Sequence, residues 1–361
     1  MSIDIGIVGL TQSGKTTIFN ALTKGQADTK SSTPHIGKAK VPEPRLKALA
    51  DMLQPKRVVP AEVSYIDIGA TVKGGERGMG SQLLGELSNT DALINVVRAF
   101  TDDSIPHVEG SLDVERDITA IDLELALHDA GIISRRLERI ETSLKGADPT
   151  ERQGLLREQQ LLEKLKAELE KEVPIRQLGL TADETKAISN FQFLTAKPLL
   201  IAVNIGEGQI GESTSLEAEL NSRHRGAGRG VIALCGKLEM ELTQLDEEAE
   251  KECRTEFGIT EPVLERVIRL SYQLLDLITF FTTVSEEVKA WPIPRGTTAL
   301  KAAGKIHSDM ERGFIRAEAI SYDELMKCGG MAEAHKKGRL RLEGKSYPVQ
   351  DGDVITFLFN V

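Results

Sequence analysis

The stretch Gly9-Leu10-Thr11-Gln12-Ser13-Gly14-Lys15-Thr16 has the pattern G-x-x-x-x-G-K-[ST] and decides the fold. It follows an apolar run at 3–8, which predicts a strand, and it precedes a segment whose apolar residues are spaced for one buried helical face. A glycine-containing turn at the carboxyl end of a strand lets backbone N–H groups converge on phosphate oxygens. The stretch therefore predicts a binding site for a nucleotide triphosphate.

The residues of this loop have separate expected roles. Lys15 supplies positive charge to the β- and γ-phosphates, and the Thr16 hydroxyl is a suitable ligand for Mg²⁺. Thr17 is expected to help hold the α-phosphate. The other loop residues that we predict to bind nucleotide are Gln12, Ser13 and Gly14.

Length and composition indicate a folded protein of about two or three domains, since the chain has 361 residues and is 40% hydrophobic. No apolar run approaches the roughly 18 to 20 residues that cross a bilayer, and no leader precedes the first strand, so we expect a cytoplasmic protein without membrane contact. The net charge of −10 disfavours a broad nucleic-acid-binding surface and leaves only local contact with RNA.

Strand-like and helical patterns alternate over most of the chain, which predicts an α/β fold with a doubly wound, mostly parallel sheet. After the first strand, the predicted strands are Glu62 to Ile68, Ala92 to Ala99, Pro198 to Asn204 and Gly230 to Gly236. An insertion at 117–194 is rich in Leu, Glu, Lys and Arg and predicts a helical hairpin, whose turn includes Asp148 as a cap and Pro149 in the first helical turn.

The C-terminal segment changes to short alternating runs, so we predict a small β-rich domain at 278–361 and a nucleotide-binding domain at 1–277. Asp351-Gly352 is typical of a hairpin turn, which would pair 347–349 with 354–357. A basic cluster precedes this turn, and it is either ordinary solubility charge or a patch for RNA or an acidic partner. The cluster consists of Lys336, Lys337, Arg339, Arg341 and Lys345.

Two further segments are expected to complete the nucleotide site. Asp67 ends the strand that starts at Glu62, where a carboxylate can reach Mg²⁺ through water, and the glycine-rich segment at 69–80 suits a switch that moves when the γ-phosphate is lost. Directly after the predicted strand Pro198 to Asn204, the segment Asn204-Ile205-Gly206-Glu207 has the form N-x-x-E and is expected to face the base. A guanine-reading loop usually carries Asp at the last position, so Glu207 weakens the case for strict GTP selectivity.

Taken together, these residues resemble the YchF-type, Obg-like P-loop NTPases over nearly the full length of the chain. The matching blocks include the phosphate loop with 19–23, the Asp67 segment, 204–207 and, in the C-terminal segment, 280–282, 290–291, 304–309, 313–318, 343–345 and 351–354. This resemblance implies a G domain, a coiled-coil insertion and a C-terminal β-grasp-like TGS domain. It also implies Mg²⁺-dependent ATP hydrolysis, with GTP accepted in some members, and association with ribosomes.

The resemblance also implies a catalytic histidine in a loop, and His107 is the residue at that position. The chain departs from the family at Gly69-Ala70, where the glycine is displaced by one residue, and at Gln12, which stands at an asparagine position. In the first switch, either Ser31 or Thr33 is expected to be the Mg²⁺ ligand, and Pro34 matches the family's proline if the ligand is Ser31.

The sequence therefore predicts an NTPase that prefers or accepts ATP, turns over slowly by itself and acts as a nucleotide-controlled switch on ribosomes or translation factors. Lys15 and His107 are the predicted catalytic residues. RNA contact is expected through the TGS domain, and the protein is expected to be a monomer. The rival hypothesis is a nucleotide-gated binding module with negligible hydrolysis, which the displaced Gly69 motivates.

Overall fold

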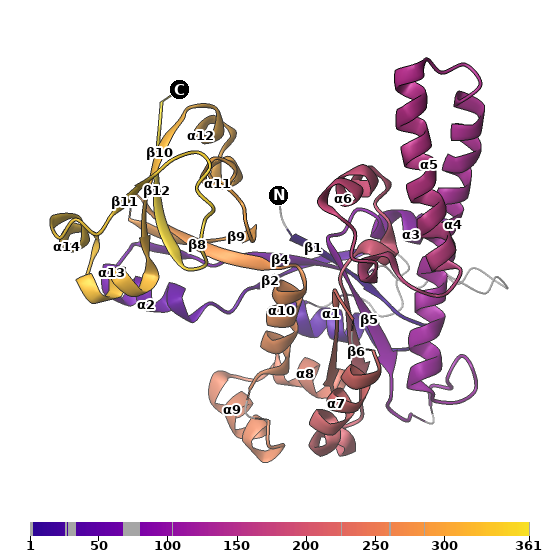
Figure 1. The fold of residues 1–361 in the computed structure, drawn as a ribbon. Coiled ribbons are helices and arrows are strands. Elements are labelled where there is room, and N and C mark those ends of the chain that lie inside the picture. The colour runs from indigo at the N-terminus through magenta and orange to yellow at the C-terminus, as the bar shows by residue number, and fades with distance from the viewer. Residues whose placement is uncertain are drawn as a thin grey trace. The chain divides into compact units, whose positions relative to one another are not determined.

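The computed structural model describes residues 3–25, 27, 34–67, 80–102, 104–224, 226–259, 261–284 and 286–360 (Figure 1). The chain forms two compact units, and each is described by itself below. The larger consists of 3–38 and 64–264, and the smaller groups 39–63 with 265–361. Within the part of the chain that the structure describes, no helix has the length and apolar character needed to cross a membrane.

The first sheet has six strands in the order β2-β4-β1-β5-β6-β7. The strands are β1 (Ile3–Val8), β2 (His35–Lys40), β4 (Glu62–Asp67), β5 (Ala92–Arg98), β6 (Leu199–Asn204) and β7 (Arg229–Leu234). The neighbours β1, β5, β6 and β7 are parallel, and every residue of β5 and β6 is buried, as in a sheet covered on both faces. The predicted α/β sheet is therefore confirmed, with β2 added at its edge.

Helices of the larger unit connect these strands. They are α1 (Lys15–Thr23), α3 (Ser81–Leu87), α4 (Val114–Ser143), α5 (Pro149–Leu169), α6 (Ala182–Ile188), α7 (Ser213–Arg223), α8 (Gly236–Leu242) and α9 (Glu247–Glu256), with short 3-10 helices at Ile175–Gln177, Ser189–Phe191, Leu194–Ala196 and Glu207–Glu212. The helix α10 (Val263–Leu274) follows them. Because the parallel strands share one direction, the loops after β1, β5, β6 and β7 meet at one edge of the sheet.

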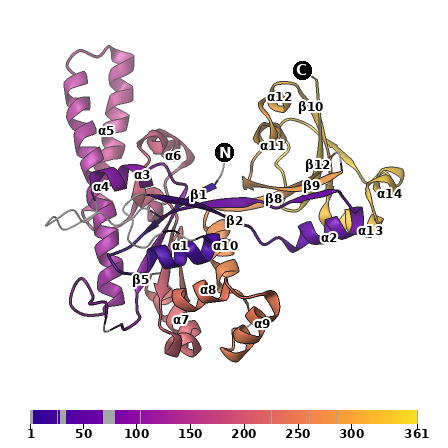
Figure 2. The same ribbon diagram turned by 180° about the vertical axis from the view of Figure 1, so that it is seen from behind.

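The predicted helical hairpin is confirmed as α4 and α5, which lie side by side in both views (Figures 1 and 2). Asp148 caps α5 by accepting hydrogen bonds from the N–H groups of Thr150 and Glu151. The Arg136 guanidinium on α4 makes two hydrogen bonds, of 2.7 and 2.8 Å, to the Glu158 carboxylate on α5. Buried leucine and isoleucine side chains from both helices form the rest of the hairpin's core.

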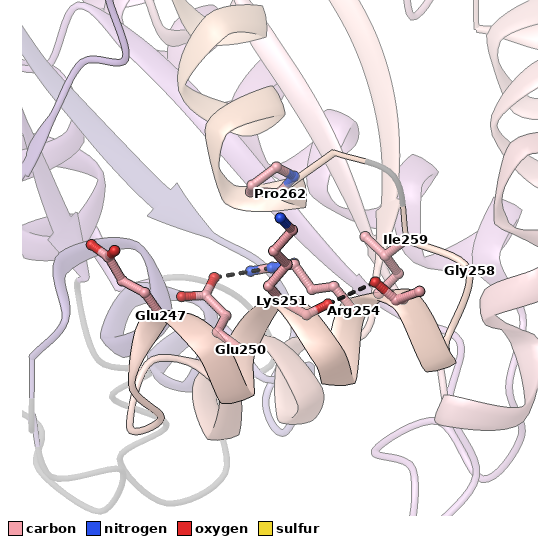
Figure 3. A pocket seen from close by; sticks show the side chains of 8 residues that line it. Glu247, Glu250, Lys251, Arg254, Gly258, Ile259 and Pro262 are labelled. Carbon is pink, nitrogen blue, oxygen red and sulfur yellow. Dashed lines mark hydrogen bonds and ion pairs between the residues drawn. The ribbon is translucent and has the colours of Figure 1, made fainter.

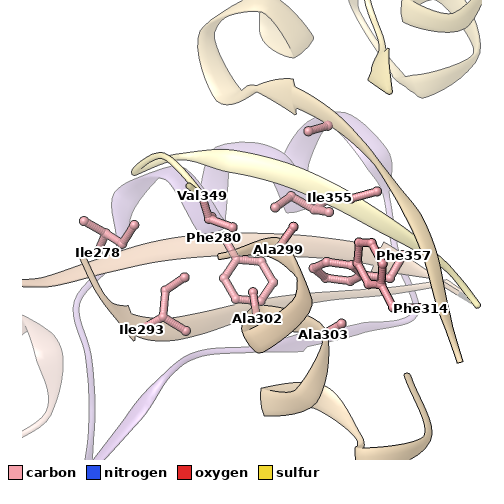
Figure 4. Packing of buried hydrophobic residues seen from close by; sticks show 12 residues of the cluster. Ile278, Phe280, Ile293, Ala299, Ala302, Ala303, Phe314, Val349, Ile355 and Phe357 are labelled. Carbon is pink, nitrogen blue, oxygen red and sulfur yellow. The ribbon is translucent and has the colours of Figure 1, made fainter. Parts of the chain in front are cut away.

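The smaller unit contains a second six-stranded sheet, in the order β11-β10-β12-β8-β9-β3. Its strands are β3 (Arg57–Val59), β8 (Leu277–Val284), β9 (Glu287–Pro294), β10 (Phe314–Ser321), β11 (Arg341–Glu343) and β12 (Asp353–Phe359), and its helices are α2 (Pro44–Leu53), α11 (Ala299–Ile306), α12 (Ser308–Arg312), α13 (Tyr322–Cys328) and α14 (Met331–Lys336). Small residues of α11 pack against Phe280, Phe314 and Phe357 to form its core (Figure 4).

The hairpin that we predicted across Asp351-Gly352 is wrong. β12 pairs with β10 and β8, while Pro348 forms an isolated bridge to Thr298. The reason is that the turn bonds to β8 and α2 instead: Asp351 accepts a hydrogen bond from the Thr279 N–H and pairs with Arg45, 2.8 Å from Nη1 to Oδ2. These partners lie far away in the sequence, so a local turn signal does not reveal them.

Residues 39–63 lie in the smaller unit, although the sequence placed them in the domain 1–277. Besides the Arg45–Asp351 ion pair, two further kinds of contact help to hold this segment there. β3 pairs with β9 in parallel, and the Arg45 guanidinium lies 5.5 Å from the centre of the Phe281 ring. The grouping splits the predicted domain 1–277, whereas the predicted insertion at 117–194 lies in the larger unit and the predicted domain 278–361 lies in the smaller. The assignment of these segments to functions stays a prediction.

Candidate phosphate-binding site

The phosphate loop joins β1 to α1 and requires glycine at two positions. Gly9 has φ +147° and Gly14 has φ +94°, which L side chains rarely adopt. A Cβ at Gly9 would lie 2.3 Å from the Val96 carbonyl oxygen, and one at Gly14 would lie 2.2 Å from Asn204 Nδ2. One side of the loop is therefore packed tightly against β5 and β6. The backbone of the loop forms its opposite side.

Lys15 begins α1 and is buried, with 8% of its surface exposed. Its Nζ donates to the carbonyl oxygens of Gly9 and Leu10, at 3.0 and 2.8 Å. Burial lowers the pKa of Lys15 to about 8, although the nearby Asp67 carboxylate acts in the opposite direction. The Lys15 ammonium group is thus held within the loop in which it is predicted to bind the β- and γ-phosphates.

Thr16 and Asp67 meet beside this lysine. The Thr16 Oγ1 donates a 2.6 Å hydrogen bond to Asp67 Oδ2, and Asp67 is fully buried at the end of β4. The other carboxylate oxygen, Oδ1, is buried and has no hydrogen-bond partner among the residues that the structure describes. A hydroxyl and a carboxylate are the hard oxygen donors that Mg²⁺ prefers, and an unsatisfied buried oxygen is costly, so this pair fits the predicted metal.

The structure describes most of the other predicted loop residues. Ser13 is buried, and its Oγ has no hydrogen-bond partner within the described ranges. Gln12 is exposed with φ +63°, and Thr17 lies in the first turn of α1. The predicted switch residues Ser31 and Thr33 and the displaced Gly69-Ala70 pair lie outside the described residues.

Asn204 joins three segments of the site. Its Nδ2 donates to the Ser13 carbonyl oxygen at 3.0 Å, and its Oδ1 accepts from the Gly236 N–H at 2.9 Å. The phosphate loop, the end of β6 and the start of α8 are thereby tied together by one buried amide. The following residue, Ile205, is also buried and belongs to the core between β6, β7 and α8.

Glu207, the other polar residue of the N-x-x-E loop, is paired with Lys237. The distance between Lys237 Nζ and Glu207 Oε1 is 2.9 Å, and the side chains are 68% and 43% exposed, respectively. Sequence reasoning missed Lys237, because it lies 30 residues away, in the first turn of α8.

His107 lies after β5 in a network with the first turn of α4. Its Nε2 is 2.8 Å from Asp117 Oδ2, and its Nδ1 accepts a hydrogen bond from the Glu109 N–H at 3.1 Å. Arg116 also bonds to Asp117, and both His107 and Asp117 are buried side chains. Among the contacts found for His107 in the described residues, none is with the phosphate loop.

Arg98, at the end of β5, shapes the loop that carries His107. Its guanidinium donates to the carbonyl oxygens of Phe100 and Ile105, at 3.2 and 2.8 Å, and lies 4.5 Å from the centre of the Phe100 ring. The sequence analysis did not single out this residue. The signal available was an arginine at the end of an otherwise apolar buried strand, because a buried guanidinium needs several acceptors.

Two other features of the chain stand out, one in each unit. A cavity of about 530 Å³ lies along α9 and the following loop (Figure 3). Arg254, which lines it, donates one hydrogen bond to Glu250 and two to Glu239. In the basic cluster of the smaller unit, Lys336 pairs with Glu333, and Arg341 pairs with Asp353.

Comparison with protein families gives two matches. Residues 277–360 match the family model YchF-GTPase_C, described as "Protein of unknown function (DUF933)". Residues 4–129 match a family described as "50S ribosome-binding GTPase". The two matches fall on the C-terminal segment and on the segment that contains the phosphate loop.

Curated proteins and a solved structure match over the whole chain. The chain is 40% identical to proteins named "Ribosome-binding ATPase YchF" from Bacillus subtilis, over 370 residues, and from Escherichia coli O157:H7, over 368 residues, with 100% of each chain covered. A solved structure, that of the Schizosaccharomyces pombe YchF GTPase, superposes with a TM-score of 0.87 at 31% identity and covers 99% of this chain and 98% of that one.

Proposed function

The chain belongs to the YchF family, and from this membership and the phosphate-loop geometry we propose that it is a Mg²⁺-dependent nucleotide triphosphatase whose nucleotide state controls its binding to ribosomes. The relatives named as ribosome-binding ATPases support ATP as the substrate and the ribosome as the partner. ATP is preferred or accepted, and GTP is the second candidate substrate.

One observation carries the proposal for the chemistry: the Thr16 hydroxyl and the Asp67 carboxylate meet beside the buried Lys15 ammonium. Thr16 and Asp67, together with Ser31, would hold Mg²⁺, which supplies charge neutralisation to the β- and γ-phosphates when bound. Lys15 and the amides of the phosphate loop would bind the same oxygens. Most of the negative charge of the transition state would therefore be stabilised by groups that are already held in position.

The remaining site residues have supporting roles in this proposal. Gln12, Ser13, Gly14 and Thr17 would bind the phosphates through the loop, while Asn204 and Glu207 would face the base. The side chain of Ile205 is buried in the core, so Ile205 would support this loop and not contact the base through its side chain. His107 would orient water or stabilise charge once it leaves Asp117 and the Glu109 N–H.

A second candidate function has one observation in its favour. Both ring nitrogens of His107 are already hydrogen-bonded, to Asp117 and to the Glu109 N–H. If these bonds persist with nucleotide bound, the protein would be a nucleotide-gated binding module with negligible hydrolysis.

Single-turnover ATP hydrolysis with and without ribosomes separates these two functions, with Lys15→Ala as the reference. We expect the wild-type rate to exceed that of Lys15→Ala and to rise with ribosomes. A rate equal to that of Lys15→Ala in both conditions would favour the binding module. Sedimentation with ribosomes in ATP or ADP tests the switch, because equal binding in both nucleotides contradicts nucleotide control.

The setting of this function is also proposed. A ribosome-associated protein is expected in the cytoplasm, and translation factors are a second class of partner. We place any RNA contact on the TGS segment at 278–361, where Lys337, Arg339 and Lys345 belong to the basic cluster. We expect the protein to act as a monomer.

A further inference from the structure

Lys237 lies where three loops of the sheet edge meet. It is one residue after Gly236, whose N–H is bound by Asn204, and its ammonium group pairs with Glu207, three residues after Asn204. Asp102, in the loop after β5, lies within electrostatic reach: its pKa is lowered first by hydrogen bonds from Ser104 and further by the charges of Arg98 and Lys237. Because β5, β6 and β7 are adjacent and parallel, these loops share the edge that carries the phosphate loop.

The pairing changes what Glu207 can offer a base. A free carboxylate at this position accepts from the two neighbouring N–H donors on the edge of guanine, whereas adenine presents an acceptor beside its donor. The Lys237 hydrogen bond occupies one Glu207 oxygen and neutralises the charge, and the same bond raises the pKa of Lys237. Guanine would have to displace the ammonium group before it could use both oxygens.

We propose that Lys237 is a specificity-determining residue, which lowers the preference for guanine nucleotides by holding Glu207. This inference rests on the proposed function, since it places Glu207 at the base. According to this proposal, the chain tolerates ATP because Lys237 and Glu207 form an ion pair, and not only because residue 207 is Glu.

Calorimetric titration of ATP and GTP into wild type and Lys237→Met tests the proposal. Methionine keeps an unbranched side chain and removes only the charge and the donors. The readout is the ratio of GTP affinity to ATP affinity, because both nucleotides share the triphosphate and any general electrostatic change cancels. An exposed pair is worth little, so we expect the ratio to rise about fivefold.

Two further variants make the result specific. Glu207→Gln combined with Lys237→Met should return the ratio to the wild-type value, because no carboxylate remains to be freed. Lys301→Met removes a similarly exposed lysine, 69% exposed, from its pair with Glu311 in the smaller unit and should leave the ratio unchanged.

The outcomes also separate this inference from the proposed function. If both nucleotides bind and hydrolysis is normal but the ratio moves less than about twofold in Lys237→Met, the inference alone is overturned. It is also overturned if the ratio rises equally in the double variant. If neither nucleotide binds to wild type, the proposed function fails and the inference fails with it.

Discussion

The Thr16 hydroxyl donates a 2.6 Å hydrogen bond to the carboxylate of Asp67, 51 residues later in the chain. This bond joins the first turn of α1 to the end of β4 and brings two hard oxygen donors to the same point. The buried Oδ1 of Asp67 has no partner in the described part of the chain, and it marks where a further positively charged or donating group belongs.

The first prediction concerns Asp67→Asn. The amide lacks the negative charge that a divalent cation needs, so the variant should lose the Mg²⁺-dependent part of its ATP affinity and hydrolyse ATP at least about tenfold more slowly. Titration with Mg²⁺ or with EDTA measures the first effect. Glu62→Gln, at the other end of β4, is the control and should change neither quantity. Equal Mg²⁺ dependence in Asp67→Asn and wild type would contradict the assignment.

The second prediction is a pH dependence of ATP binding. The pKa of Lys15 is lowered from 10.5 to about 8 in the folded protein, so between these values the unfolded chain holds a proton that the folded protein lacks. Phosphate binding requires the charged form and must restore that proton. ATP affinity should therefore fall by about tenfold for each pH unit above 8, with proton uptake measurable by calorimetry in two buffers.

The lowered pKa of Lys15 also affects the stability of the free protein. Burying the charged ammonium opposes folding at neutral pH, and this penalty diminishes as the pH rises from 8 toward 10.5. Lys15→Arg keeps its charge throughout this range and is the control for the affinity measurement. An affinity for ATP that stays constant from pH 7 to pH 9.5 in wild type, with no proton uptake, would contradict the prediction.

The third prediction compares two glycines with positive φ. Gly14→Ala places its Cβ 2.2 Å from Asn204 Nδ2, whereas Gly110, at φ +79°, has open space around it. We expect Gly14→Ala to lower the free energy of unfolding by about 2 to 4 kcal/mol and to abolish ATP binding, and Gly110→Ala to lower it by only about 1 kcal/mol. Urea denaturation and calorimetry check both. Equal effects of the two substitutions would show that the Asn204 contact is unimportant.

The fourth prediction tests His107. His107→Ala should slow single-turnover hydrolysis by at least about tenfold and leave ATP affinity unchanged, because the residue is proposed to act on water and not on the nucleotide. His307 offers a matched control, since its Nδ1 accepts from the Asp309 N–H at the same 3.1 Å that separates His107 from Glu109. A loss of rate equal to that of His307→Ala removes His107 from the mechanism.

Local patterns predicted much of the fold. The phosphate loop, its flanking β1 and α1 and the α4–α5 hairpin depend on residues close together in the sequence, and the structure confirms them. The edge strand β2 was missed because its residues are largely exposed and lack an apolar run. The false hairpin at Asp351-Gly352 has a related cause, since the partners of that turn, Thr279 and Arg45, are distant in the sequence.

By itself, the sequence determined that the chain carries a phosphate loop after a buried strand, because glycine freedom and hydrophobic periodicity act over a few residues. Only the tertiary structure decided which side chains form hydrogen bonds and ion pairs with one another. Lys15 bonds to its own loop, Asn204 ties the loop to α8, Glu207 is held by Lys237, and His107 is held by Asp117. The physical reason is that hydrogen bonds and ion pairs act over about 3 Å in space, while these partners are brought together by sheet order, which sequence spacing does not encode.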